Sequence, residues 1–232
     1  MTSRERVLAA LRHEEPDRVP IDLGGTVMSG IMAAALDRLR RHLGLAERPV
    51  RVYEVFQMLG EVEPDVAAAL GVDVLPVEPE VLFFGLRRDG YKPWRLFDGT
   101  EVLVPGQFDV EVSPSGDWLL HEEGDPRGPV AGRMPRNGYY FDMQSWLSLS
   151  DDFRPPDLDR LRRGRPNRVP DETLAFLQSR ARHLRRETDK ALLLGCWGAV
   201  GLPWVGSIPD FLCLLATDPG YVRDLFALRT EI

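Results

Sequence analysis

Short apolar runs alternate with amphipathic segments along much of the chain, and each run ends at a glycine or an acidic residue. Three runs have the length and character of buried strands, at residues 19–23, 72–77 and 191–194. The interval 51–59 fits either a strand or a helix. Helical periodicity is present at residues 2–12, 28–43, 64–70, 171–187, 208–216 and 221–232. Strands that alternate with helices are typical of βαβ units, so the pattern predicts an α/β fold with a parallel sheet.

The middle of the chain has a different pattern. Between Trp94 and Leu120, short alternating runs are separated by Asp98-Gly99, Pro105-Gly106 and Ser115-Gly116. Asp-Gly between alternating runs is a strong hairpin signal, so the segment predicts a β-meander. We expect residues 86–150 to form a meander and loop inserted outside the core. Residues 151–170, rich in proline and arginine, are expected to be a linker within the same domain.

Charge and cysteine content narrow the classes of protein. The 36 acidic residues outnumber the 29 basic ones, for a formal charge of −7, which argues against a nucleic-acid binder. The two cysteines cannot form a disulfide framework, and the N-terminus has no signal-peptide pattern, so we expect a cytoplasmic protein. The uncharged interval 191–209 is long enough to span a membrane. Its repeated glycines and prolines instead favour a buried strand that runs into a glycine-rich loop.

The usual chemical motifs are missing from the sequence. The four histidines are dispersed, and the chain has neither His-x-His nor Cys-x-x-Cys, so no zinc spacing is present. The segment GCWGAVG, which begins at Gly195, lacks the dinucleotide-binding fingerprint, and there is no P-loop or Gly-x-Ser-x-Gly elbow. The sequence therefore does not support a nucleotide-binding protein or a serine hydrolase.

Candidate functional residues follow the three predicted core strands. The carboxyl ends of parallel strands hold the active site in barrel enzymes, and a buried carboxylate there can act as a general acid or base. Turn capping by exposed side chains is the alternative for any single residue. We expect Asp22, Gly25, Thr26, Glu80 and Trp197 to line one cleft. The full set after the three strands is Asp22, Gly24, Gly25 and Thr26, then Glu78 and Glu80, then Cys196 and Trp197.

Four segments resemble the uroporphyrinogen decarboxylase superfamily, which includes corrinoid-dependent methyltransferases. They are RERVLAALRHEEPDRVPIDLGGT from Arg4, DVAAALGVDVLPVEPEVL from Asp65, GCWGA from Gly195 and FLCLLATDPGYVRDLF from Phe211. The order and spacing of the segments carry the resemblance. It implies a TIM-type (β/α)8 barrel, of which these 232 residues would be an incomplete, N-terminal part, because such barrels take about 250 residues without insertions. We expect such a part to be inactive alone and to associate through an exposed sheet edge.

Departures from the family pattern bear on the activity. At the positions where true decarboxylases carry two arginines that bind substrate carboxylates, this chain has Gly25 and Ser29, and the family's catalytic aspartate falls on Glu80. Loss of both arginines removes charge-assisted bonds worth about 1.5–3 kcal/mol each. This loss argues against decarboxylation of an octacarboxylate substrate. Of the carboxylates that follow the predicted strands, we expect Glu80 and Asp22 to be catalytic. Gly24, Gly25, Thr26, Ser29, Glu78, Cys196 and Trp197 are expected to bind substrate or cofactor.

The resemblance favours a methyltransferase that moves a methyl group between a corrinoid and a thiol or other acceptor. A decarboxylase-like lyase acting on a tetrapyrrole or another carboxylate is the alternative, and a non-catalytic fragment or binding module is the third reading. In a complete methyltransferase, corrinoid and zinc would be cofactors, with zinc ligands beyond Ile232, so no metal or cofactor site is expected within this chain. The expected partners are a small-molecule, tetrapyrrole or corrinoid substrate and a corrinoid protein, without nucleic acid or membrane.

Overall fold

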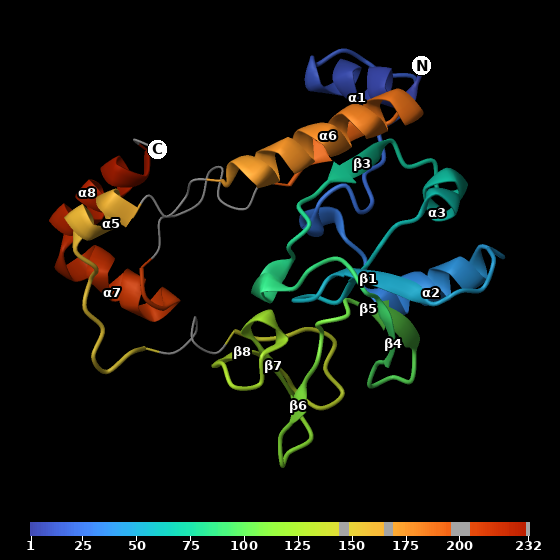
Figure 1. Cartoon of the computed structure of the whole chain (residues 1–232). Coiled ribbons are helices and arrows are strands. Elements are labelled where there is room, and N and C mark those ends of the chain that lie inside the picture. Colours follow the sequence, from blue (N-terminus) through green and yellow to red (C-terminus); the bar gives the residue numbers. More distant parts are fainter. Residues whose placement is uncertain (144–148, 165–168, 196–204, 231–232) are drawn as a thin grey trace. The chain divides into compact units, whose positions relative to one another are not determined.

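The computed structural model describes residues 1–143, 149–164, 169–195 and 205–230 (Figure 1). The chain divides into two compact units. The first unit comprises residues 1–142 and 172–195, and the second comprises residues 143–171 and 196–232. The described residues combine helices with strands, which confirms a mixed α/β class, but their strands form three separate sheets and no closed barrel. In the same ranges, no helix is long and apolar enough to cross a membrane.

The largest sheet has four strands in the order β2-β1-β5-β4. Strand β1 (Val50–Glu54) is parallel to β5 (Glu101–Val104) and antiparallel to β2 (Leu59–Gly60), so the ambiguous interval 51–59 contains strands. Strand β4 (Lys92–Arg95) pairs with β5 in the hairpin predicted at Asp98-Gly99. At the turn, Gly99 has a φ of +84°, which glycine adopts without steric cost.

A second sheet, in the order β6-β7-β8, continues the strand-rich middle of the chain. Strands β6 (Glu111–Val112), β7 (Trp118–His121) and β8 (Val130–Met134) are antiparallel neighbours, as a meander requires. We expected residues 86–150 to lie outside the core of a barrel, and the described residues form no barrel against which to judge this. Part of the segment does contribute to the hydrophobic core of the first unit. Alternate side chains of β5 and β7 are buried in the same hydrophobic core as β1, since Val102, Val104 and Leu120 are fully buried together with Val52.

The third sheet pairs β3 (Val74–Val77) with β9 (Ala191–Leu194). The strands are parallel, with Val74 opposite Ala191 and Val77 opposite Leu194, which confirms two of the three predicted core strands and their direction. The third prediction is wrong because residues 19–23 form no strand. Pro20 has no N–H to donate to a ladder, and the N–H of Ile21 donates to the Asp73 carboxylate (2.9 Å) instead of to a neighbouring strand.

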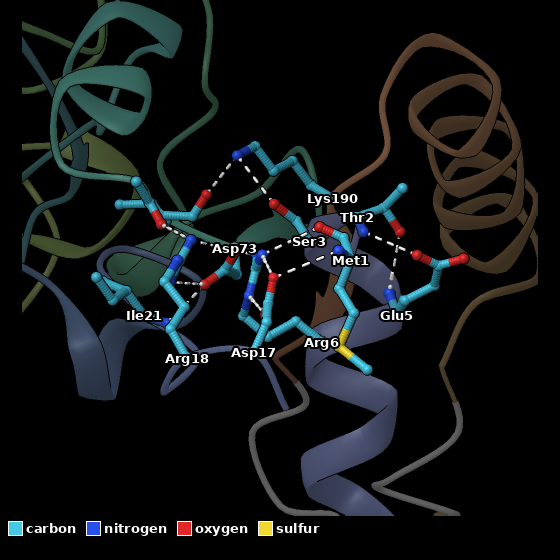
Figure 2. Close-up of polar contacts among 12 residues, drawn as sticks. Met1, Thr2, Ser3, Glu5, Arg6, Asp17, Arg18, Ile21, Asp73 and Lys190 are labelled. Carbon is cyan, nitrogen blue, oxygen red and sulfur yellow. Dashed lines mark hydrogen bonds and ion pairs between the residues drawn. The ribbon is translucent and has the colours of Figure 1, made fainter. Parts of the chain in front are cut away.

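A polar cluster joins the N-terminal segment to the start of β3 (Figure 2). The fully buried carboxylate of Asp73 accepts hydrogen bonds from Arg6 Nη1 (2.6 Å) and Arg18 Nη1 (2.7 Å). Helix α1 (Ser3–Leu11), which carries Arg6, begins at Thr2 with the predicted capping box to Glu5. Lys190, just before β9, donates through Nζ to the Val72 carbonyl (2.5 Å), so the cluster also reaches the third sheet.

The remaining helices of the first unit follow the predicted positions, with shifted ends. Helix α2 begins later than predicted, because residues 27–29 form a separate turn of 3-10 helix. Helix α3 starts at a proline and ends before Gly71, as predicted, and α6 covers the predicted interval. The bounds are η1 (Val27–Ser29), α2 (Ala33–His42), α3 (Pro64–Ala69), η2 (Phe83–Gly85), η3 (Glu122–Gly124) and α6 (Asp171–Glu187).

The second unit contains helices α5 (Leu158–Gly164), α7 (Ile208–Thr217) and α8 (Pro219–Thr230). Residues 151–170, expected to be a linker, therefore include a helix. The side chains of Phe211, Leu214, Val222 and Leu225 form the buried centre of this unit. The predicted helices at 208–216 and 221–232 correspond to α7 and α8.

Candidate active site

The loop that follows the first predicted strand packs against the third sheet. A Cβ atom on Gly25 would lie 2.7 Å from Val74 Cγ2 and 2.9 Å from Leu193 Cδ1, so only glycine lets the backbone approach β3 and β9 this closely. The N–H of Gly25 donates to Asp22 Oδ1 (3.0 Å). Gly25 is thus packed against β3 and β9 although residues 19–23 form no strand.

A cleft of about 440 Å³ opens in the first unit beyond the end of β3. This volume lies in the range of small-molecule sites. Of the predicted residues, Gly24, Glu78 and Glu80 line the cleft. The other lining residues come from β1, α3, the loop after β3 and α6. They are Tyr53, Glu61, Val62, Glu63, Pro64, Leu75, Pro76, Pro79, Arg87, Arg88, Asp89, Phe176, Arg180 and Leu184.

Glu78 has the chemistry of a general acid or base. Its side chain is 11% exposed, and its Oε2 accepts a hydrogen bond from Arg88 Nη1 at 2.9 Å. Burial, together with the nearby negative charges of Glu61 and Glu54, raises the pKa of Glu78 to about 7, although the Arg88 charge lowers it. A carboxyl group with a pKa near neutrality can give or take a proton in the same pH range.

Two further groups, Tyr53 and Arg88, lie beside Glu78. The guanidinium of Arg88 lies 5.9 Å from the ring centroid of Tyr53, at the end of β1. Burial, with the charges of Glu78 and Glu54, raises the pKa of the Tyr53 hydroxyl, so this group stays protonated near neutral pH. It donates a long hydrogen bond to the Thr26 carbonyl (3.5 Å), which connects the cleft to the loop 22–29.

Glu80, expected to be catalytic, has a different environment. Its side chain is 52% exposed, and its nearest cation is Arg87 at 3.8 Å. Glu80 thus lines the cleft as a solvent-exposed carboxylate beside Arg87. The structure therefore favours Glu78, which we had expected only to bind, over Glu80 as the proton-transfer group.

The remaining predicted residues lie outside this cleft. Asp22 is exposed and caps the turn at Gly25. Thr26 and Ser29 cap η1: Thr26 Oγ1 accepts from the Met28 N–H, and the Thr26 N–H donates to Ser29 Oγ. The single cleft expected to contain Asp22, Gly25 and Thr26 is thus not formed by these side chains. Cys196 and Trp197 lie outside the described residues.

Sequence reasoning missed most of the cleft residues, and Tyr53, Arg88 and Arg180 are those with polar side chains that the site uses. Tyr53 ends an interval whose structure the pattern left open. Arg180 is four residues from both Phe176 and Leu184, and this spacing places all three on one face of α6. This spacing can be seen in the sequence, but it does not show that the face borders a cleft.

Comparison with protein-family models, with curated proteins and with solved structures gives no match to this chain. Across the described ranges, no group of three or more His, Cys, Asp or Glu side chains is arranged to hold a metal ion.

Proposed function

We propose that the chain belongs to an enzyme of the uroporphyrinogen decarboxylase superfamily, with a barrel-type fold, which transfers a methyl group between a corrinoid and a thiol or other acceptor. The four sequence segments quoted above support the family. The observation that carries an enzymatic role is Glu78, a largely buried carboxyl group whose pKa is raised to about 7 at the end of a parallel strand.

In this proposal Glu78 acts as the general base that accepts a proton from the small-molecule partner. A thiol or hydroxyl acceptor must lose a proton as it takes up a methyl group, and the Glu78 carboxylate would accept it. Arg88, paired with Glu78 at 2.9 Å, stabilises the carboxylate form and holds its orientation. General acid–base catalysis of this kind contributes about 10²–10⁴-fold to a rate.

The cleft does not form a site for the corrinoid itself. Its volume of about 440 Å³ suits a small substrate, and a corrin macrocycle with its side groups is larger. A corrinoid supplies the methyl group or receives it. We therefore assign the cleft to the small-molecule partner alone.

Decarboxylation by a lyase is the second candidate function, and the arginines of the cleft favour it. Arg88 and Arg180 line the same cleft as the protonatable Glu78. When a carboxylate substrate loses CO₂, the bonding electron pair stays on carbon, and the protonated form of Glu78 would deliver the proton that this carbon needs.

The variants Glu78→Gln and Glu80→Gln separate these roles. The protein is incubated with methylcobalamin and a panel of small thiols, and loss of the cobalt–methyl bond is followed by absorbance. Release of CO₂ from small carboxylates is followed in parallel. The sequence pattern led us to expect an inactive part of a barrel, but the cleft around Glu78 lies within the first unit. We therefore expect turnover in one of the two assays, lost about 100-fold or more in Glu78→Gln and retained within a few-fold in Glu80→Gln.

Each assay has an outcome against the proposal. Loss of activity in Glu80→Gln with full activity in Glu78→Gln would return the catalytic role to Glu80. Turnover only in the CO₂ assay would favour the lyase. The absence of turnover in both assays would support a binding module instead.

A further inference from the structure

We propose that the molecule bound in this cleft is a small, largely apolar oxyacid whose anionic group is held by Arg180. This inference rests on the proposed function, because it names the substrate class of the same cleft. Two observations support it: the ion pairing of the charged lining residues and the arrangement of side chains along α6.

Every carboxylate that lines the cleft already has an arginine partner. Glu78 pairs with Arg88, and Arg87 lies 3.2 Å from Asp89 and 3.8 Å from Glu80. Glu61 and Glu63 pair outside the cleft with Arg51 (3.3 Å) and Arg48 (2.8 Å). Asp89 and Glu80 share the single guanidinium of Arg87, and both are more than half exposed to solvent.

Arg180 is the exception among the charged lining residues. In the part of the chain that the structure describes, no carboxylate oxygen lies within 4.0 Å of its guanidinium. Arginine presents a planar fork of donors that matches carboxylate and phosphate oxygens. Arg180 is thus the lining cation without an acidic partner among the described residues, and an anion is the ligand that its guanidinium fits.

The neighbours of Arg180 on α6 are apolar. Phe176 and Leu184 lie one turn before and one turn after it, and both line the cleft. Val62, between β2 and α3, and Leu75 of β3 contribute further apolar side chains. A ligand that reaches from Arg180 towards Glu78 would therefore need an apolar body between its anionic group and its reacting atom.

Hydrogen bonds from α1 hold the C-terminal end of α6 in place. Arg4 Nη2 donates to the Thr188 carbonyl (2.7 Å), and the Arg4 N–H donates to the Asp189 carbonyl (2.8 Å). Arg180 lies about two turns before this anchor. Its backbone position is thus set by contacts that do not involve the cleft, as a preformed ligand site requires.

Calorimetric titration with model ligands tests the inference without knowledge of the substrate. The probes are 3-phenylpropionate, its uncharged amide 3-phenylpropanamide, and phenyl phosphate. The proteins are the unmodified chain, Arg180→Gln, and Arg182→Gln as a matched control, because Arg182 is exposed on the same helix and does not line the cleft. Circular dichroism checks that each variant is folded.

We expect 3-phenylpropionate to bind about tenfold or more tightly than its amide to the unmodified chain and to Arg182→Gln, because a charged acceptor strengthens its bond to arginine. This preference should disappear in Arg180→Gln. Tighter binding of phenyl phosphate than of 3-phenylpropionate would identify the oxyacid as a phosphate.

Equal binding of acid and amide, no binding of either, or an acid preference that survives in Arg180→Gln would overturn the inference. The variant Glu78→Gln distinguishes a failure of this inference from a failure of the proposed function. This variant should lose turnover and still bind 3-phenylpropionate more tightly than the amide. Catalysis by Glu78 and anion binding by Arg180 are therefore tested independently.

Discussion

Glu78 and Glu80 lie two residues apart after β3, yet their side chains meet different surroundings. Glu78 is 11% exposed and pairs with Arg88, whereas Glu80 is 52% exposed. In a strand, residues two positions apart point to the same side, but β3 ends at Val77, before both glutamates, so this alternation does not apply to them. Burial then raises the pKa of Glu78 to about 7, and this value can be measured through stability.

We predict that the free energy of unfolding of the unmodified protein falls, relative to that of Glu78→Gln, as the pH rises from 4.5 to above 7. The folded pKa of about 7 exceeds the ordinary value of 4.5, so the folded state holds the proton more tightly. The resulting stabilisation is complete below pH 4.5 and is lost as the pH rises through 7. Its size is about 3 kcal/mol at 1.36 kcal/mol per pKa unit.

Urea unfolding of both proteins between pH 4.5 and 8.5 measures this difference. The other titratable groups are common to both proteins, so their contributions largely cancel. A constant difference across the pH range would show that Glu78 ionises in the folded protein as it does in the unfolded chain.

At the scale of elements, Asp73 joins parts of the chain that are distant in sequence. It comes directly before β3, and it accepts hydrogen bonds from Arg6 of α1, from Arg18 and from the backbone of Ile21 (Figure 2). Both Asp73 and Arg6 are buried, with side chains 0% and 8% exposed. The cluster lies at the start of β3, opposite to the strand end that carries Glu78, so its role is to hold the elements together.

We predict that Asp73→Asn lowers the free energy of unfolding by about 3–5 kcal/mol, because it leaves the Arg6 guanidinium buried with half of its compensating charge removed. Asp17→Asn is the matched control. Asp17 also pairs with Arg6 (2.6 Å), but it is 43% exposed, so its loss should cost about 1 kcal/mol or less. Urea unfolding of the two variants measures both values, and equal losses would contradict the assignment of Asp73 as the central partner.

At the scale of the whole molecule, the described residues build separate buried centres in the two units. Leu36 belongs to the large cluster of the first unit, and Leu225 belongs to the cluster of the second. Both side chains are fully buried. Because each cluster draws its residues from one unit only, a cavity in one unit should leave the other intact.

We predict that Leu36→Ala and Leu225→Ala each destabilise one unit by about 2–5 kcal/mol. Hydrogen exchange followed by mass spectrometry of peptides should show faster exchange in residues 1–142 for Leu36→Ala, and in residues 205–230 for Leu225→Ala. If either variant accelerates exchange equally in both units, the two units share one cooperative structure.

Local features were predictable from the sequence. The capping box at Thr2, the helix that starts at Pro64 and the hairpin at Asp98-Gly99 depend on residues within a few positions of one another. The pairing of β3 with β9 was also predictable, because two short apolar runs in a βαβ pattern favour parallel neighbours. Of the five residues expected to share one cleft, Glu80 lines the cleft beyond β3, and so do Gly24 and Glu78 from the wider set of candidates.

The sequence by itself therefore determined the local elements, the parallel pair and the region of the candidate site. Only the tertiary structure decided that residues 19–23 bond to the Asp73 side chain, that β5 joins β1 in the main core, and that Glu78 is buried while Glu80 is exposed. It also decided that Arg180 faces the cleft from a helix about 100 residues further along the chain. The physical reason is that burial, pKa and charge pairing depend on contacts between distant segments, which hydrophobic periodicity within a short window does not encode.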